Sequence, residues 1–308
     1  MIEIDFQKYL LSKKNLDKRS INKDVFKSFL RKLLALGKNN TKIIDVGCGT
    51  CSLVEFILQS DIIEKINFCC MDTDLINLKL GKKNIYNFAK KNSFNIYKSK
   101  DFFKIRKGDI DCDIFFLNSD IFSQELIDNF YNRDVDCIIA NAFIDIVPIE
   151  DAITVFKKLL TINGFVYLTI NYDGITTLRP SFNDFNFEKL LLKEYNKTMD
   201  ERKLNGKLTG GSNTGSKIYD AFLQNGFKII NFGSSNWNVF PENKKYKKNE
   251  KFFLKTMIGF IYNEGLNRKN IDKNKLNVWY QDRLEKINNE ELSLIVQNTD
   301  ILAQIKRN

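Results

Sequence analysis

The sequence of 308 residues contains no histidine, three prolines and two tryptophans. Without an imidazole the chain cannot use a Ser-His-Asp triad, a Cys-His pair or a histidine-ligated metal. Proton transfer in any reaction must therefore fall to Asp, Glu, Lys, Tyr or Cys side chains.

Long apolar runs are also missing. The apolar segments have the length of strands, so we expect no transmembrane helix. The first residues carry acids early and lack the basic-then-apolar order of a signal peptide, which indicates a cytoplasmic protein. With 43% hydrophobic and 28% charged residues, the chain is expected to fold around a sizeable core.

The six cysteines do not form a convincing metal-binding pattern. Cys48 and Cys51 are spaced as half of a zinc site, but there is no second spaced pair and no histidine. Cys69 and Cys70 lie in an apolar segment, where neighbouring strand residues point to opposite faces. We therefore expect reduced, mostly buried thiols and no bound metal.

The formal net charge of +10 is that of many nucleic-acid-binding proteins. However, nine of the 48 basic residues are arginine and 39 are lysine. Nucleic-acid sites depend on the forked hydrogen bonding of arginine. We interpret most of the lysines as solvated surface, which disfavours nucleic acid as a partner, and we keep RNA binding as an alternative.

Residues 42–56 read as a strand, a tight turn and a helix. An apolar run containing Asp45 leads into Gly47-Cys48-Gly49, and apolar residues then recur at helical spacing. Glycines let the backbone approach a ligand closely. A dinucleotide-binding turn would have a third glycine where this chain has Ser52. An ordinary glycine-containing turn is the alternative.

Three later strands also end in polar or mixed segments. The strand at 66–71 leads to Asp72 and Asp74, and a carboxylate there can accept both hydroxyl protons of a ribose. Capping of the helix at 75–88 is the other reading of these acids. The strands at 114–117 and 135–140 lead to segments 118–122 and 141–147.

The D-x-G-x-G pattern resembles motif I of the class I S-adenosylmethionine (AdoMet) methyltransferases. The resemblance implies an α/β fold: a Rossmann-like doubly wound, seven-stranded, mostly parallel sheet with an antiparallel last strand and a helical cap. It implies AdoMet as cofactor, with Asp45 bracing the loop near the cationic end of AdoMet and Asp72 holding the ribose. The residues that it implies for cofactor binding are Asp45, Gly47, Cys48, Gly49, Asp72, Asp120, Ile121, Asn141, Phe143 and Arg19.

Three later segments are similar to those of one bacterial subgroup of this family: Y-D-G-x-T from 172, Y-N-x-T-M-D-x-R from 195, and G-S-N-T-G from 211. Asn213 stands where the subgroup has arginine. We expect Asp173 or Tyr172 to accept a proton, with Asp200 next; loop fastening by these acids is the alternative. The residues expected on the substrate side are Asn171, Tyr195, Met199, Arg202, Ser212, Asn213 and Trp237.

Four parts are expected along the chain: lid helices at 1–38, an AdoMet-binding core at 39–240, a helical cap at 241–290, and a last strand at 291–308. The prolines at 148, 180 and 241 do not form the Pro-Pro-aromatic or Pro-Cys signatures of base methylases. We therefore expect methylation of an oxygen or nitrogen on a small molecule. An RNA methyltransferase and a non-catalytic AdoMet-binding protein are the alternatives, and the sequence leaves the oligomeric state open.

Overall fold

The computed structural model describes residues 1–37, 40–60, 65–99, 102–123 and 134–306. One large sheet runs through the molecule, and the seven expected strands lie in it in the order 3-2-1-4-5-7-6. They are β5 (Ile110–Asn118), β2 (Lys65–Asp72), β1 (Thr41–Val46), β6 (Val135–Asn141), β7 (Leu160–Arg179), β12 (Ser293–Ile305) and β10 (Phe227–Ser234). Neighbours in this row pair in parallel except at β12, which is antiparallel to both β7 and β10. The predicted fold class is confirmed.

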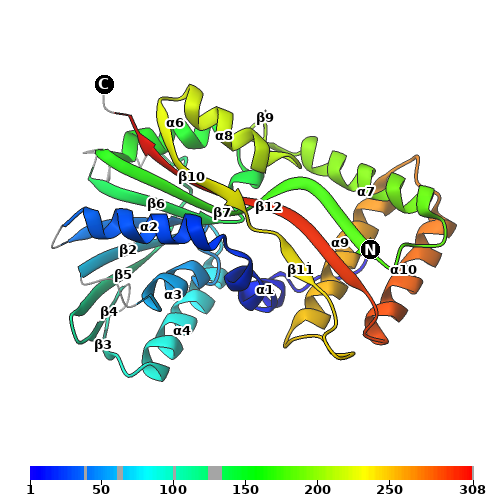
Figure 1. Ribbon diagram of the computed structural model, residues 1–308, viewed down its shortest axis with the longest axis horizontal. Helices are drawn as coiled ribbons and strands as arrows, with labels where there is room; N and C mark the ends of the chain where they lie inside the picture. The colour runs from blue at the N-terminus through cyan, green and yellow to red at the C-terminus, as the bar shows by residue number, and fades with distance from the viewer. Residues whose placement is uncertain (38–39, 61–64, 100–101, 124–133, 307–308) are drawn as a thin grey trace.

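Helices cover both faces of the sheet (Figure 1). One face carries α2 (Lys23–Ala35), α3 (Ser52–Leu58) and α4 (Leu75–Lys91), and the other carries α6 (Ile149–Leu159) and α8 (Thr214–Gln224). Adjacent residues of a strand enter opposite cores, because side chains alternate across a sheet. Cys137 belongs to the first core and Ile138 to the second, and both are fully buried.

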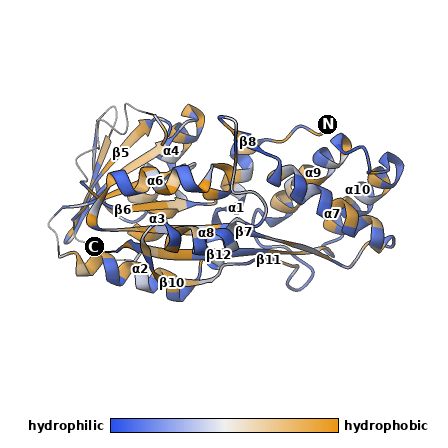
Figure 2. Ribbon diagram, turned by 90° about the horizontal axis from the view of Figure 1, so that it is seen from above, coloured by the Kyte–Doolittle hydropathy of each residue, from blue (hydrophilic) through white to orange (hydrophobic). Residues whose placement is uncertain are grey.

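The second half of β7 leaves the main sheet and continues as a two-stranded ribbon with β12. Leu178 pairs with Leu294 there, and Thr176 with Val296. Three helices gather around this ribbon at one end of the molecule: α7 (Phe185–Asp200), α9 (Glu250–Asn267) and α10 (Lys273–Asn288) (Figures 1 and 2). The helices α9 and α10 lie within segment 241–290, for which the sequence predicts a helical cap.

Helix α1 (Phe6–Ser20) connects the sheet with the helical end. Tyr9 stacks on Phe253 of α9, with ring centroids 5.9 Å apart, and meets Phe260 edge to face at 5.3 Å. The strand β11 (Trp237–Val239) also lies beside α1 and pairs with β12. None of the helices in the described part of the chain combines the length and apolarity needed to cross a membrane.

The lysine- and asparagine-rich sequence of residues 89–112 predicts an irregular segment, and this prediction is wrong. After α4 the chain forms a hairpin of β3 (Asn95–Lys98) and β4 (Phe102–Lys107) that extends the sheet beyond β5. Lys104 lies 3.3 Å from Asp113 and Arg106 lies 3.2 Å from Asp111, so the charges pair across the strands. Charged residues are typical of sheet edges, where they discourage pairing with another chain. In the sequence they interrupt the alternation of apolar and polar residues by which a strand is recognised.

Candidate functional site

The loop after β1 is shaped by two glycines. Gly47 and Gly49 both have left-handed φ values, +61° and +52°. A Cβ atom on Gly47 would lie 2.4 Å from Cδ2 of Phe143, so only glycine lets the loop pack against that ring. The loop is also tied to β2, because Cys48 N donates to Met71 O at 2.9 Å and Gly49 N donates to Asp72 Oδ2 at 2.8 Å.

A cavity of about 450 Å³ opens at the carboxyl ends of β1, β2, β5 and β6. Strand β1 pairs with β2 on one side and β6 on the other, so this is the topological switch point at which doubly wound sheets bind ligands. The cavity has the volume of a small-molecule or cofactor site. Nine of the ten predicted cofactor residues line it: Asp45, Gly47, Cys48, Gly49, Asp72, Asp120, Ile121, Asn141 and Phe143.

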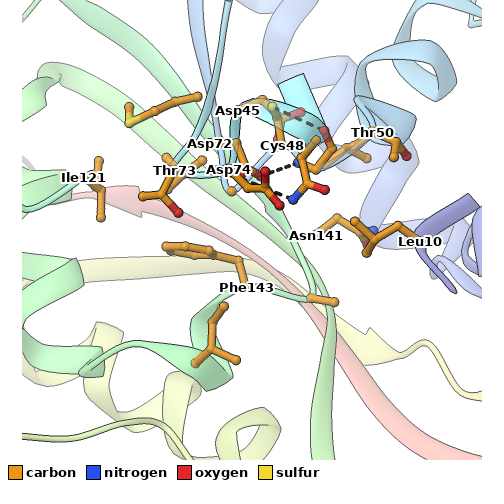
Figure 3. Close-up of a pocket in the computed structure, with 18 of the residues that line it drawn as sticks. Leu10, Asp45, Cys48, Thr50, Asp72, Thr73, Asp74, Ile121, Asn141 and Phe143 are labelled. Atoms are coloured by element: carbon orange, nitrogen blue, oxygen red, sulfur yellow. Dashed lines mark hydrogen bonds between the residues drawn. The ribbon is translucent and has the colours of Figure 1, made fainter. Parts of the chain in front are cut away.

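Figure 3 shows how the walls are arranged. The ring of Phe143 faces the segment from Asp72 to Asp74, Ile121 lies towards one end, and Leu10 and Asn141 lie towards the other. Ile121 therefore marks one end of the cavity and Asn141 the other, with the segment from Asp72 to Asp74 between them and opposite the ring of Phe143. This arrangement suits an elongated ligand that has a flat apolar part, hydroxyl groups and a charged part.

Asp45 is the most unusual group in the cavity wall. Asp45 is 1% exposed, and neither of its carboxylate oxygens has a hydrogen-bond partner in the described part of the chain. Burial raises the pKa of this carboxyl well above its ordinary value, and the nearby Cys51 and Asp72 raise it further. A buried carboxylate without a partner is costly unless a cation or a donor completes it. The cavity therefore favours a ligand with positive charge.

Asp72 and Asp74 divide two roles between them. Asp72 Oδ1 accepts from Asp74 N at 2.9 Å, and its Oδ2, bound to Gly49 N, keeps a lone pair for a ligand hydroxyl. Asp74 caps α4 by accepting from Ile76 N at 2.7 Å, and it also accepts from Gln7 Nε2 at 3.2 Å. The helix-capping alternative thus describes Asp74, and both aspartates lie at the cavity wall.

The end of the cavity after β5 is formed by Asp120 and Ile121. Ile121 is 3% exposed and packs into the core of the α6 face, so its position is fixed. Asp120 is exposed, and its Oδ1 accepts from Phe122 N at 3.0 Å. No hydrogen bond from the described residues reaches its second carboxylate oxygen.

Helix α1 contributes a cation that the sequence reasoning missed. Lys13 lines the cavity, is 6% exposed, and forms an ion pair with the fully buried Asp17. Asp17 also accepts from Asn141 Nδ2 at 3.0 Å and from Trp237 Nε1 at 2.9 Å, so it joins α1, β6 and β11. The only signal in the sequence was the i,i+4 spacing of an opposite charge pair on a helix.

Arg19 was predicted to bind the cofactor, but the structure gives it other partners. Its guanidinium forms an ion pair with the buried Glu250 and donates to Asn238 O at 3.0 Å. It does not line the cavity. Trp237, predicted on the substrate side, likewise serves Asp17 and lies outside the cavity lining.

The three predicted catalytic residues do not line the cavity, and the loop-fastening alternative describes the two acids. Asp173 Oδ1 accepts from the backbone N and the Oγ of Ser216, both at 2.7 Å. Asp200 Oδ1 accepts from the backbone N of Ser212 at 2.8 Å and from its Oγ at 2.9 Å. Tyr172 OH donates to Asn196 Oδ1 at 2.9 Å, and Tyr172 lines a separate groove beside α7.

The other residues predicted on the substrate side lie in β7, in the loop before α8, and on or just after α7. Asn171 is buried and donates to Thr299 O at 2.8 Å, and the Asn213 side chain packs against Gly174. Ser212 is held by Asp200. Tyr195, Met199 and Arg202 lie on or just after α7, outside the cavity lining.

A second polar cluster lies beside the cavity, around Asp145. Asp145 follows the lining segment of Asn141 and Phe143, and its Oδ1 is buried without a hydrogen-bond partner among the described residues. Burial raises the pKa of this carboxyl, while Arg202 and Lys13 oppose the rise. The carboxyl in turn contributes, after burial, to the raised pKa of Tyr9 and Tyr195. Sequence reasoning did not select Asp145.

The ionisable groups of the cavity lining are mostly acidic. Four lining residues are aspartates and one is a lysine; the acids are Asp45, Asp72, Asp74 and Asp120, and the base is Lys13. This balance is opposite to that of the whole chain, whose net charge is +10. Within the described residues, no group of three or more His, Cys, Asp or Glu side chains is arranged to hold a metal ion.

Comparisons with known proteins found no matching protein-family model and no matching curated protein. Solved structures with a similar course include a cyclopropane synthase from Mycobacterium tuberculosis, with 12% identity, 89% of this chain and 82% of that chain covered, and a TM-score of 0.41. A geranyl diphosphate C-methyltransferase from Streptomyces coelicolor A3(2) has 8% identity, with 91% and 80% covered and a TM-score of 0.41. A putative sarcosine dimethylglycine methyltransferase from Galdieria sulphuraria has 11% identity, with 90% and 83% covered and a TM-score of 0.40.

Proposed function

We propose that this chain binds AdoMet across the cavity and transfers its methyl group to an oxygen or nitrogen of a small molecule. The observation that carries the proposal is the cavity at the sheet's switch point, which is lined by four aspartates and one lysine. One of these aspartates, the buried Asp45, has no hydrogen-bond partner among the residues that the structure describes. When bound, AdoMet supplies a methyl group carried on a positively charged sulfur.

The residues present fit the parts of AdoMet. The carboxylate of Asp45 would lie next to the positively charged end of AdoMet. Lys13, in place of Arg19, would form an ion pair with the AdoMet carboxylate. Asp72 would accept hydrogen bonds from the ribose hydroxyls. At the other end, Ile121 would cover the adenine ring, and Asp120 would accept from its amino group.

The same groups oppose a dinucleotide or another polyphosphate. Phosphates are bound by glycine-rich turns, arginine or lysine. Here Ser52 replaces the third glycine, and one lysine faces four aspartates. Moving a diphosphate into this cavity would place like charges close together. The acidic lining likewise disfavours the backbone of a nucleic acid, whereas a neutral or cationic small acceptor would be tolerated.

Asp145 lies directly behind the cavity lining, between the lining residues Phe143 and Ile146, and we assign it to the acceptor's proton in place of Asp173, Tyr172 and Asp200. Its Oδ1 has no hydrogen-bond partner among the described residues, and burial raises its pKa, which makes the carboxylate a stronger base than an exposed aspartate. We expect Asp145→Asn to lower kcat by about 10²–10⁴-fold, the usual contribution of general acid–base catalysis, with AdoMet affinity unchanged. Turnover at the wild-type rate would exclude this role.

The experiment that tests the proposed function is incubation of the purified protein with methyl-labelled AdoMet and a cell extract, followed by separation of the products by size. Label in the small-molecule fraction is the expected result. Label in RNA would support the alternative of an RNA methyltransferase. AdoMet binding without labelled product would indicate a binding protein, and absence of AdoMet binding would refute the proposal altogether.

A further inference from the structure

Three cysteine sulfurs meet at the glycine-rich loop, and the proposed methyl transfer makes no use of them. The Sγ atoms of Cys48 and Cys51 are 3.8 Å apart. Cys70 of β2 is close enough to alter the pKa of both thiols. All six cysteines are free, and the described residues do not assemble a metal site from them. The chemistry open to the cluster is therefore that of thiols.

The backbone already holds Cys48 and Cys51 at a separation that a disulfide can span. Cys51 N donates to Cys48 O at 2.8 Å, which closes a four-residue turn. The first and last Cα atoms of such a turn lie within about 7 Å, and disulfides join Cα atoms about 4.4–6.8 Å apart. Bond formation requires the sulfurs to approach from 3.8 Å to about 2.05 Å, which movements of the two side chains together with a small shift of the loop backbone can supply.

The surroundings give the two thiols different access. Cys51 is fully buried, and a Cβ atom on Gly81 of α4 would lie 2.5 Å from its Sγ, so α4 closes tightly around this sulfur. Cys48 is 7% exposed and lines the cavity. A small solute that enters the cavity therefore meets Cys48 first, with Cys51 directly behind it.

The two thiols also differ in acidity. Hydrogen bonding with the Cys48 and Cys70 thiols lowers the pKa of Cys51 to about 5. The hydrogen bond to Cys51 raises the pKa of Cys48, and burial adds to the rise. Because a thiolate is the attacking species in disulfide formation, Cys51 is suited to attack an oxidised Cys48.

We propose that Cys48 and Cys51 form a reversible disulfide that weakens AdoMet binding, so that the wall of the cofactor cavity is a redox-sensitive site. The effect on binding rests on the proposed function, whereas formation of the bond does not. The oxidant class is a peroxide small enough to enter the cavity.

The reaction balances with hydrogen peroxide. The Cys51 thiolate first takes the thiol proton of Cys48 along the contact between the two sulfurs. The Cys48 thiolate then attacks one peroxide oxygen, the O–O bond breaks, and the departing hydroxide takes the proton back from Cys51 to become water. The Cys51 thiolate then attacks the sulfenic sulfur of Cys48. The S–S bond forms, the S–O bond breaks, and the second hydroxide leaves and is protonated to water. Two thiols and one peroxide thus give one disulfide and two waters.

The disulfide would alter two walls of the cavity, because the residues flanking Cys48 are both held by other contacts. Gly47 packs on Phe143, and Gly49 N donates to Asp72 Oδ2. Drawing Cys48 towards Cys51 strains both contacts. By linkage, a ligand that binds the reduced form better must itself oppose oxidation, and bound AdoMet would also cover Cys48.

The bond itself is tested by mass spectrometry after peroxide treatment, alkylation without reductant, and trypsin digestion. Cys48 and Cys51 share the tryptic peptide 43–65, while Cys69 and Cys70 lie in peptide 66–79. We expect peptide 43–65 to be unalkylated and lighter by two hydrogen atoms, and dithiothreitol to reverse the change. A cross-link between the two peptides, or full alkylation of peptide 43–65, would overturn the assignment.

The effect on the site is tested by calorimetry with AdoMet on the reduced and oxidised protein. We expect at least tenfold weaker binding after oxidation, and slower oxidation at saturating AdoMet. Cys51→Ser and Cys51→Ala should each lose the response to peroxide, whereas Cys69→Ser, outside the cluster, should keep it. Equal affinity of the reduced and cross-linked forms would refute the redox effect. Absence of AdoMet binding by the reduced protein would instead refute the proposed function, with the mass result still standing.

Discussion

At the scale of single residues, the site depends on groups whose hydrogen bonding is incomplete within the protein. Asp45 has two buried oxygens without partners in the described chain, and Asp145 has one. Most buried polar atoms in proteins are satisfied, so such exceptions point to a ligand or a reaction. Asp45 could be selected from the sequence because of its place before Gly47. Asp145 could not, because its burial follows from the tertiary packing.

The raised pKa of Asp45 gives a prediction about protons. A bound cation lowers the pKa of a neighbouring carboxyl, so AdoMet binding should release protons at pH values below the raised pKa of the free protein. Affinity should then increase as the pH rises through that range. Calorimetry in buffers of different ionisation enthalpy measures the release directly.

The matched variants are Asp45→Asn and Asp120→Asn. Asp45→Asn should abolish the proton release and weaken AdoMet binding by about 10–100-fold, since hydrogen bonds to charged groups contribute about 1.5–3 kcal/mol. Asp120→Asn, at the end of the cavity marked by Ile121, should retain the proton release. Proton release that persists in Asp45→Asn would show that another group is responsible.

Asp300 allows a stability prediction away from the cavity. It is fully buried, accepts from Ile170 N at 2.8 Å and Asn22 N at 2.7 Å, and has a pKa that burial raises from 3.8 to about 6. Between these values the folded chain binds more protons than the unfolded chain. Its contribution to stability is therefore present below pH 4 and is lost as the pH rises through 6.

The measurement is the free energy of unfolding of wild type and Asp300→Asn from pH 4 to pH 7. The advantage of wild type should shrink with rising pH by up to about 3 kcal/mol, the equivalent of the difference between the two pKa values. The control variant Asp184→Asn lacks a carboxyl whose pKa is lowered by Lys275. The advantage of wild type over this variant should therefore grow, not shrink, as the pH rises. A pH-independent difference for Asp300→Asn would contradict the account.

At the scale of elements, strand ends decide which polar residues reach the site. Buried apolar runs predicted the strands and therefore Asp45, Asp72, Asp120 and Asn141 at their carboxyl ends. The same logic misplaced Asp173. Thr169 of β7 is the residue level with the end of β6, and β7 continues ten residues further to Arg179 because it pairs with β12. The ribbon carries Asp173 past the cavity, and no local pattern marks where the sheet stops.

Substitution of Asp173 tests whether this residue stabilises the fold by joining β7 to α8. Its carboxylate accepts from Ser216 N in the first turn of α8 and so caps that helix from outside. We expect Asp173→Ala to lower the free energy of unfolding by about 0.5–2 kcal/mol, the usual effect of losing a cap, with AdoMet affinity and turnover of the folded protein unchanged. Asp173→Asn keeps one oxygen and should lose less stability. A large fall in turnover at full stability would restore the catalytic role that the sequence suggested.

At the scale of the whole molecule, the net charge of the chain is positive, whereas the ionisable side chains that line the cavity are mostly acidic. The chain carries a net charge of +10, yet aspartates outnumber lysines in the lining of the cavity at the switch point of the sheet. Several arginines are engaged in ion pairs: Arg19 with Glu250, Arg106 with Asp111, and Arg268 with Glu194 and Glu201. Composition alone could show the surplus of lysine. Only the folded arrangement shows that the surplus is kept away from the cavity.

The measurement that tests the central claim most directly is calorimetry of the reduced protein with AdoMet, S-adenosylhomocysteine and NAD⁺ under identical conditions. The account predicts that AdoMet and S-adenosylhomocysteine bind at one site and compete with each other, and that NAD⁺ does not bind, because its diphosphate would enter a cavity lined by four aspartates and one lysine. Binding of NAD⁺ with no binding of AdoMet would contradict it.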